Sequence, residues 1–504
     1  MTIQTPDWIR DAVFYQIFPD RFSKSNRVKR TGLGFEPWDS PPNPYGFKGG
    51  DLYGVKDHLD YLLDLGINAI YFNPLTSSAS NHRYHPYDYF KIDPLLGGDQ
   101  AFRELLDAAH EVGIRIVPDG VFNHTSRGFW QFHHVLENGD GSPYVDWFYF
   151  NPNRLNRQKN WGAYPDEQEK QLLNSGVGSY DAIGYNAWWN LPALPKLNTN
   201  TQAVRNFIFE AAEYWLNFGA DGWRLDVPSE INDDSFWREF RQRVKAVNSD
   251  AYIVGEIWHE SQRWLQGDQF DAVMNYLVTA ALMGWLIGDN LPSYAFQIGD
   301  FHKVLRATNA AQFGDRIDYL LNLYAPEINY AQLNLLDSHD TPRFLTLAGG
   351  DKSALMLAYF FLFTYIGAPC IYYGDEIGLD GGPDPECRKS FPWDNTKWDQ
   401  DLHAFMQSLV SLRKTHKALR RGTYERVYSD QDVIAYLRIY QGENLLVVIN
   451  SGSNERLLTF EMLCPGKPPV KASVMFGNGQ LGAVDGFAKE LKIRARNGMV
   501  LKIE

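Results

Sequence analysis

The chain has 504 residues, of which 44% are hydrophobic and 22% charged, so it has enough apolar surface for a large core and is not disordered as a whole. Its 48 Lys and Arg stand against 61 Asp and Glu, and the formal net charge of −13 would repel the phosphate backbone of a nucleic acid. Nucleic-acid binding is therefore a poor first hypothesis. The 15 Trp and 28 Tyr join a flat apolar face to a polar edge, which suits amphipathic ligands such as sugars.

The cysteine content and the lack of long apolar segments indicate in which cellular compartment the protein acts. Cys370, Cys387 and Cys464 are too few for a disulfide framework and do not have the paired spacing of a zinc site. The N-terminal sequence shows no basic segment followed by a long apolar stretch, and no run reaches the roughly 18 apolar residues of a membrane span. We therefore expect a soluble, cytoplasmic protein without a membrane segment.

The first four hundred residues alternate helical patterns with short β-rich runs, and a glycine often stands where a helix would end. Eight such runs can be counted, the number that closes a parallel (β/α)8 TIM barrel. In chain order they are AVFYQIF near the N-terminus, INAIYF at 67–72, IRIVPD at 114–119, DGWRLD ending at Asp226, AYIVGE ending at Glu256, FDAVMNY near 271, AQLNLLD near 333 and APCIYYGDE ending at Glu376.

The spacing of these runs predicts the domain organisation. About a hundred residues separate the third run from the fourth, where one helix and its loops need about a third of that length. We therefore expect the barrel at 1–122 and 186–415 and an inserted, aromatic lobe at 123–185. The pattern then changes to short alternating runs such as DVIAYLRIY and NLLVVIN, separated by turn residues. These predict an all-β sandwich domain at 416–504.

The predicted strands end in acidic residues, and the C-terminal ends of strands are where parallel barrels place their reacting groups. These ends carry Asp119, Asp226, Glu256, His339 with Asp340, and Asp375 with Glu376. A single one of them could be a helix cap or an ion pair, but several at one mouth indicate chemistry. Paired carboxylates with one kept protonated are what cleavage of a glycosidic bond needs. Metal binding is the competing use, although the neighbouring Arg224 suits an anionic nucleophile better than a divalent ion.

Four segments on the third, fourth, fifth and seventh strands, DGVFNH, GWRLDVP, GEIWH and LLDSHD, resemble the signature segments of the α-amylase family of glycoside hydrolases (family 13). GGDLYGV after the first strand and GAPCIYYGDEIGL at the eighth agree with this resemblance. LPKLN at 194–198 is similar to the MPKLN type of the neopullulanase, cyclomaltodextrinase and maltogenic amylase subfamily. The match runs from about residue 10 to the C-terminus and implies an α-glucan as the substrate.

By these motifs the resemblance implies that Asp226 is the nucleophile that forms a glycosyl-enzyme ester, Glu256 the general acid and then base, and Asp340 a third carboxylate that binds sugar hydroxyls. Arg224 projects to the same face of its strand as Asp226 and is expected to keep that carboxylate ionised. Glu256 has no cation beside it in the sequence and is expected to keep its proton. The chemistry needs no cofactor, and retention of configuration is implied by the family alone.

The resemblance assigns substrate contacts to seven further residues, Tyr84, His124, Arg224, Trp258, His339, Asp384 and Arg388. The two histidines match positions that hydrogen-bond the sugar at subsite −1, and the tyrosine matches the aromatic on which that sugar ring stacks; each could instead satisfy a loop backbone. Asp384 and Arg388 resemble residues that contact sugars further toward the non-reducing end. Trp258 resembles an acceptor-side platform, with packing under the inserted lobe as the alternative.

Three features depart from the subfamily pattern. Members usually carry an extra N-terminal β-domain that mediates dimerisation, whereas the barrel pattern begins here by residue 13, so a homodimer and a preference for cyclic or short substrates both stay open. The loop RFSKSNRVKR is basic where calcium-binding relatives have Asn and Asp, which disfavours calcium, although Gly50 and Asp51 remain as candidate ligands. His85 stands where relatives often have Asp.

We therefore expect a retaining α-glucan hydrolase that acts on cyclodextrins, pullulan or maltooligosaccharides through α-1,4 and optionally α-1,6 cleavage, with transglycosylation as a side activity. One alternative is a mainly transferring enzyme, an α-glucosidase or a sucrose-type isomerase, against which the LPKLN and EIWH segments argue. An alternative of another class is an inactive amylase-like binding subunit. Such proteins lose the catalytic carboxylates, and all three are present in this chain.

Overall fold

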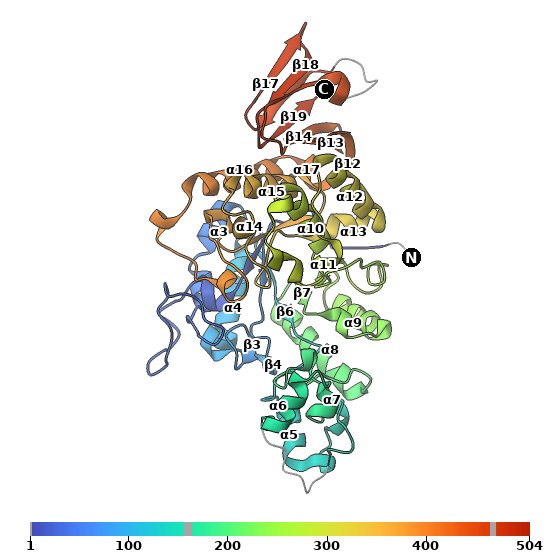
Figure 1. Ribbon diagram of the computed structural model, residues 1–504. Helices are drawn as coiled ribbons and strands as arrows, with labels where there is room; N and C mark the ends of the chain where they lie inside the picture. The colour runs from blue at the N-terminus through green and yellow to red at the C-terminus, as the bar shows by residue number, and fades with distance from the viewer. Residues whose placement is uncertain (1–2, 156–163, 464–469) are drawn as a thin grey trace.

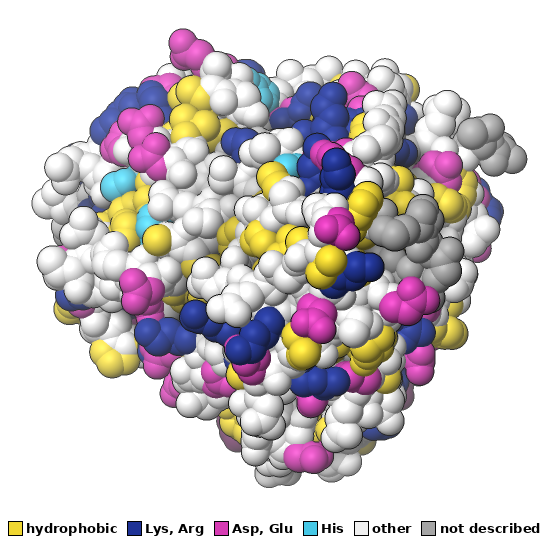
Figure 2. All heavy atoms as spheres, turned by 90° about the horizontal axis from the view of Figure 1, so that it is seen from above, with side chains coloured by type: hydrophobic (Ala, Val, Ile, Leu, Met, Phe, Trp, Pro, Cys, Tyr) yellow, Lys and Arg dark blue, Asp and Glu magenta, His cyan; other side chains and the backbone are white. Residues whose placement is uncertain are grey.

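The computed structural model describes residues 3–155, 164–463 and 470–504, so Cys464 and part of the expected lobe lie outside the described residues. The chain forms a central barrel, with a lobe at one end and a β-domain at the other (Figure 1). No helix in the described part of the chain combines the length and the apolar character needed to cross a bilayer. On the face shown in Figure 2, acidic and basic side chains are interspersed, so the negative surplus is not gathered into one patch there.

The barrel is built from the runs that the sequence predicts. Its strands are β1 Phe14–Ile17, β2 Ala69–Phe72, β5 Arg115–Val117, β6 Asp119–Gly120, β7 Gly222–Leu225, β8 Tyr252–Gly255, β9 Ala272–Val273, β10 Leu333–Asn334 and β11 Ala368–Tyr372. Pairing is parallel in the orders β10-β11-β1-β2-β5 and β6-β7-β8-β9. Pro118, which has no N–H to donate, separates β5 from β6 within one barrel strand, and a parallel bridge between Met274 and Leu333 closes the ring. The predicted (β/α)8 barrel is therefore confirmed.

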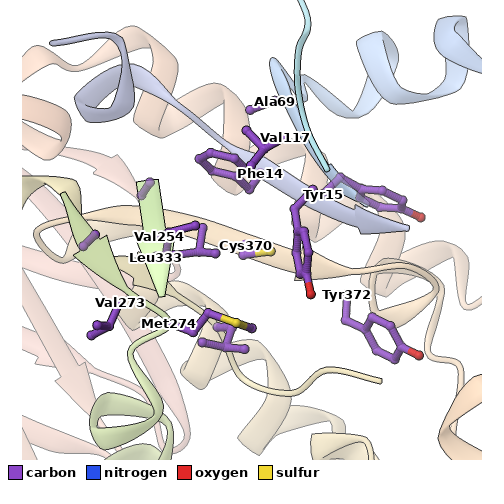
Figure 3. Packing of buried hydrophobic residues seen from close by; sticks show 14 of the residues in the cluster. Phe14, Tyr15, Ala69, Val117, Val254, Val273, Met274, Leu333, Cys370 and Tyr372 are labelled. Atoms are coloured by element: carbon purple, nitrogen blue, oxygen red, sulfur yellow. The ribbon is translucent and has the colours of Figure 1, made fainter. Parts of the chain in front are cut away.

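The interior of the barrel is a packed core and not a pore. Phe14, Val117, Val254, Leu333 and Cys370 come from five different strands and are at most 3% exposed. Figure 3 shows their side chains gathered in the barrel interior. Strands buried on both faces read as continuous apolar runs, which is why they could be recognised in the sequence.

Helices follow the strands and cover the outside of the barrel. They are α1 Pro19–Phe22, α2 Leu52–Lys56, α3 Leu59–Leu65, α4 Gly98–Glu111, α8 Gln202–Phe218, α9 Asp234–Val247, α10 Tyr276–Leu286, α11 Phe301–Val304, α12 Ala310–Leu323, α13 Pro326–Ala331, α14 Phe344–Leu347, α15 Lys352–Thr364 and α16 Gln400–Thr415. As expected, α3 and α8 end at glycines in the left-handed region, Gly66 at φ 90° and Gly219 at φ 119°. A hairpin of β3 Thr76–Ser78 and β4 Pro86–Ile92 lies in the loop after β2.

The inserted lobe follows β6 and contains α5 Trp130–Asn138, α6 Glu167–Asn174 and α7 Ser179–Ala182. Antiparallel bridges join His124 to Lys196 and Phe148 to Leu197. The LPKLN segment therefore returns along the first residues of the lobe, and pairing within the lobe reaches Leu197, beyond the expected end at 185.

The C-terminal domain consists of two antiparallel sheets, as the sequence predicts. Its elements are α17 Lys417–Arg421, β12 Thr423–Ser429, β13 Val433–Tyr440, β14 Glu443–Asn450, β15 Arg456–Thr459, α18 Phe460–Leu463, β16 Ala472–Phe476, β17 Gly479–Val484, β18 Phe487–Ile493 and β19 Asn497–Ile503. The sheet orders are β12-β13-β14-β19-β16 and β15-β18-β17, with a separate apolar cluster of their buried side chains. Arg438, fully buried on β13, donates to the carbonyl of Thr364 at the end of α15 and so ties this domain to the barrel.

Candidate active site

The ends of β6, β7 and β8 bring a buried guanidinium and three carboxylates together. Arg224 and Asp226 project to the same side of β7 because they are two residues apart on an extended chain. The strand register pairs Asp119 with Arg224, and it pairs Leu225 with Gly255. Asp226 and Glu256, which follow Leu225 and Gly255, therefore lie side by side at the ends of β7 and β8. The side chains of Arg224 and Asp119 are 0% exposed, that of Asp226 is 7% exposed and that of Glu256 is 6% exposed.

The Arg224 guanidinium contacts all three carboxylates. Its Nη1 lies 2.7 Å from Oδ2 of Asp119 and 3.3 Å from Oδ1 of Asp226, and its Nη2 lies 2.8 Å from Oε2 of Glu256. Its Nε lies 3.3 Å from Sδ of Met274 in the barrel interior. Glu256 has no cation beside it in the sequence, but β8 lies next to β7 and brings it to the same guanidinium.

One positive charge shared by three buried carboxylates leaves a surplus of negative charge. Burial and the charge of Glu256 raise the pKa of Asp226 well above its ordinary value, against the lowering effect of Arg224. The shared guanidinium therefore does not by itself keep Asp226 ionised, contrary to what the sequence suggested. Burial also raises the pKa of Asp119 to about 6, in spite of its ion pair with Arg224. The cluster as a whole therefore retains a proton at a pH where isolated carboxylates have lost theirs, and a general acid requires such a proton.

Asp340, in the loop after β10, is the most open of the predicted catalytic carboxylates, with 34% of its side chain exposed. The amide of Gln16 on β1 donates to Nδ1 of His339 at 3.0 Å, so the ring proton is on Nε2, which lies 3.1 Å from Oδ2 of Asp340. Burial and Arg388 lower the pKa of His339 well below its ordinary value, so the ring is a neutral donor. Gln16 was not predicted; a polar residue inside an apolar strand is the signal that could have identified it.

Tyr84 contacts both Asp119 and His339. Its hydroxyl donates to Oδ2 of Asp119 at 2.6 Å and accepts from Asn73 at 3.0 Å, and its ring stacks on His339 with centroids 5.3 Å apart. His124 is fully buried, and its Nε2 donates to the Tyr84 carbonyl at 3.1 Å. Burial lowers the pKa of His124 to about 3, so this ring is neutral. His124 thus satisfies a loop backbone, which was the alternative for this residue, and its contact with a sugar stays a prediction.

Trp258 packs between Tyr276 and Gly299. Its ring stacks on Tyr276, with centroids 3.6 Å apart and planes at 6°. A Cβ added to Gly299 would lie 2.5 to 2.8 Å from three adjacent atoms of the indole, so the Gly299 backbone covers the other face. The indole Nε1 donates to Oε1 of Glu256 at 3.1 Å. The ring therefore has a neighbour on each face and meets the predicted catalytic acid at its edge, while the residue as a whole stays partly exposed. Its role as an acceptor-side platform stays a prediction.

Arg388 lies closer to the predicted catalytic carboxylates than expected. It pairs with Asp384 at 3.0 Å, and it also donates to the His339 carbonyl at 2.8 Å and to Oδ1 of Asp340 at 3.4 Å. His85, in the place where relatives often have Asp, packs its ring 5.0 Å from the ring of His82. Burial lowers the pKa of His85, so a neutral ring stands where an anion is often found.

The two acidic residues after β11 do not join this cluster. Asp375 pairs with Arg343 at 2.7 Å and accepts from the Tyr359 hydroxyl at 2.5 Å. Glu376 accepts from Tyr15 at 2.8 Å and from Tyr61 at 2.5 Å. These strand-end carboxylates hold neighbouring elements together, which is the structural role that any one of the acidic ends could have had.

The candidate calcium ligands do not fit that ion. Oδ2 of Asp51 accepts from the backbone N–H of Ser25 at 2.8 Å and from the Arg30 guanidinium. Arg30 also donates to the carbonyls of Ser25 and Gly49, both at 2.6 Å. Carboxylate and carbonyl oxygens are the ligands that calcium prefers, and here a guanidinium fills their cluster. Gly50 has another reason to be glycine, because a Cβ there would lie 2.1 Å from the Pro19 carbonyl.

We predict that EDTA leaves the midpoint of thermal unfolding unchanged. Arg30→Ala should lower the stability by about 1–3 kcal/mol, because the buried Asp51 carboxylate and two carbonyls lose their donor. Differential scanning fluorimetry measures both effects, with Lys29→Ala, an exposed neighbouring cation, as the matched control. A midpoint that falls with EDTA and returns with calcium would show that the loop holds a metal.

The ionisation of Asp340 should cost stability. Burial and the charge of Glu256 raise the pKa of Asp340 to about 7. The folded state therefore holds this proton more tightly than the unfolded state, and stability is lost as the pH rises from about 4 through about 7. We predict that Asp340→Asn raises the unfolding midpoint relative to the unmodified chain at about pH 8 and less at about pH 4. An equal gain at both pH values, or a larger gain in acid, would contradict this cause.

Comparison with known proteins agrees with the geometry. Residues 16–426 match the family described as the alpha amylase catalytic domain. A cyclomaltodextrinase of a Bacillus species is 46% identical over 452 residues, which make up 89% of this chain and 74% of that protein. Neopullulanase 2 of Thermoactinomyces vulgaris is 38% identical over 462 residues, 91% of this chain and 72% of that protein. The solved native form of the Nostoc punctiforme debranching enzyme is 43% identical, with a TM-score of 0.86 and 100% of both chains covered. The chain therefore belongs to the α-amylase family and is a glycoside hydrolase.

Proposed function

We propose that the protein is a retaining α-glucan hydrolase that cleaves α-1,4 glucosidic bonds in cyclodextrins, pullulan and maltooligosaccharides. The observation that carries the proposal is the pair of buried carboxylates, Asp226 and Glu256, held on one guanidinium. Asp340, more open, completes the site together with the neutral His339. The names of the relatives, a cyclomaltodextrinase and a neopullulanase, support the substrate class.

In the proposed reaction, Asp226 attacks the anomeric carbon while the bond from that carbon to the glycosidic oxygen breaks. The electron pair of that bond stays on the oxygen, which takes the proton of Glu256 and leaves as a hydroxyl. A water molecule, deprotonated by the Glu256 carboxylate, then attacks the same carbon and releases Asp226. Arg224 contacts both Asp226 and Glu256. It can therefore stabilise the Asp226 carboxylate before the attack and the Glu256 carboxylate after the proton has left.

Two further activities are candidates for the same site. An acceptor sugar in place of water would give transglycosylation. Cleavage of α-1,6 bonds is a second candidate activity, supported by the name of the Nostoc punctiforme debranching enzyme, whose whole chain aligns with this one.

Each proposed step uses side chains of this chain, so the proposal requires no cofactor. Buried free thiols at Cys370 and Cys387 support action in the cytoplasm.

The nucleophile is tested by Asp226→Asn. This change removes the anion that forms the ester, so kcat on β-cyclodextrin should fall by about four orders of magnitude with the fold retained. Circular dichroism checks the fold, and the exposed Asp250→Asn is the matched control that should keep full activity. An unchanged rate would mean that another residue is the nucleophile.

Chromatography of products from β-cyclodextrin, pullulan and maltose completes this test. We expect ring opening and pullulan cleavage to be faster than cleavage of maltose. Hydrolysis of maltose alone would instead favour the α-glucosidase alternative.

A further inference from the structure

We propose that Trp258 positions the catalytic acid by donating its indole N–H to Oε1 of Glu256, and that the transferable proton resides on this same oxygen. The proposal rests on the proposed role of Glu256 as the general acid. It differs from the platform role predicted for Trp258 because it uses the edge of the ring and not a face.

The two oxygens of the Glu256 carboxyl have different surroundings. The backbone N–H of Val227 lies 3.2 Å from Oε2, and Nη2 of Arg224 lies 2.8 Å from it. Both groups can only donate, so a proton on Oε2 would face two donors and no acceptor. Oε1 meets one neutral donor, the indole N–H, at 3.1 Å. A hydroxyl at Oε1 can accept from the indole and at the same time donate to the leaving oxygen.

The direction of the indole N–H is fixed by the groups on both faces of the ring. Tyr276 lies parallel to one face, and the Gly299 backbone lies against the other. Phe301 adds an edge contact with ring centroids 5.3 Å apart. A ring enclosed in this way has one orientation, so it can direct Oε1 as a rigid donor.

The same packing reaches the third carboxylate. The Tyr276 hydroxyl lies 3.2 Å from Oγ of Ser338, and the backbone N–H of Asp340 donates to that Oγ at 3.2 Å. Glu256 and Asp340 are therefore connected through Trp258, Tyr276 and Ser338. The acid and the carboxylate that faces the sugar are thus placed in one packed unit.

The test compares two substrates whose leaving groups differ in their need for a proton. Trp258→Phe keeps a ring in the stack and removes the N–H. On maltoheptaose, whose sugar leaving group must be protonated, kcat/KM should fall by about tenfold to a hundredfold through kcat. On α-maltosyl fluoride, where fluoride leaves with little need for an acid, kcat/KM should change less than about threefold.

Two more variants make the result decisive. Trp264→Phe is the matched control: Trp264 is a buried tryptophan of the same loop that meets His259 edge-on, and this change should leave both rates unchanged. Gly299→Ala, whose Cβ would press on the indole, should displace the N–H and give the same dependence on the leaving group even if Trp258→Phe does not fold. Equal losses on both substrates, or a loss confined to KM, would overturn the proposal.

The proposed function fails in a different way. If the unmodified protein cleaves neither substrate, the hydrolase assignment is wrong. If Glu256→Gln keeps full activity on maltoheptaose, Glu256 is not the acid, whatever Trp258 does.

Discussion

The buried guanidinium of Arg224 is the interaction on which the site depends. Three carboxylates end three adjacent barrel strands, and without a cation among them their burial would be prohibitively costly. Arg224 lowers the free-energy cost of burying the three carboxylates, but its single positive charge does not balance their negative charges. Burial and the remaining negative charge raise the pKa values of Asp226, Asp119 and Asp340, so the cluster as a whole keeps a proton that isolated carboxylates would have lost. Because the contacts require β6, β7 and β8 to be in register, the site forms only when these three strands are paired.

The surrounding residues orient each proposed catalytic group. Gln16 sets the tautomer of His339, whose Nε2 lies 3.1 Å from Asp340, and Tyr84, between β3 and β4, donates to Asp119. Trp258 does the same for Glu256 by the proposal made above. The side chains of Gln16, His339, Tyr84 and Trp258 are neutral, so they direct hydrogen bonds without adding to the unbalanced charge of the cluster. The strand-end acids after β11, by contrast, are fully engaged by tyrosines and an arginine and serve the fold.

The sequence predicted the barrel strands and the acidic strand ends because both are local patterns: short apolar runs, and polar residues directly after them. It also indicated from the basic loop that calcium is disfavoured, without showing that Arg30 fills the oxygen cluster itself. The contact of Arg224 with Glu256 depends on strand register, and the covering of Trp258 depends on Gly299, 41 positions along the chain. Gln16 and His339 are 323 positions apart. No local pattern encodes such pairs, so they required the structure.

The proposed mechanism requires that a carboxylate oxygen of Asp226 forms the covalent bond to the sugar. A fluorinated glucosyl fluoride that forms the glycosyl-enzyme readily and releases it slowly allows this to be measured directly. After brief incubation and proteolysis, mass spectrometry should find the sugar mass on the peptide that contains Asp226. A label on the peptide that contains Glu256, or turnover of the reagent with no labelled peptide, would contradict the account.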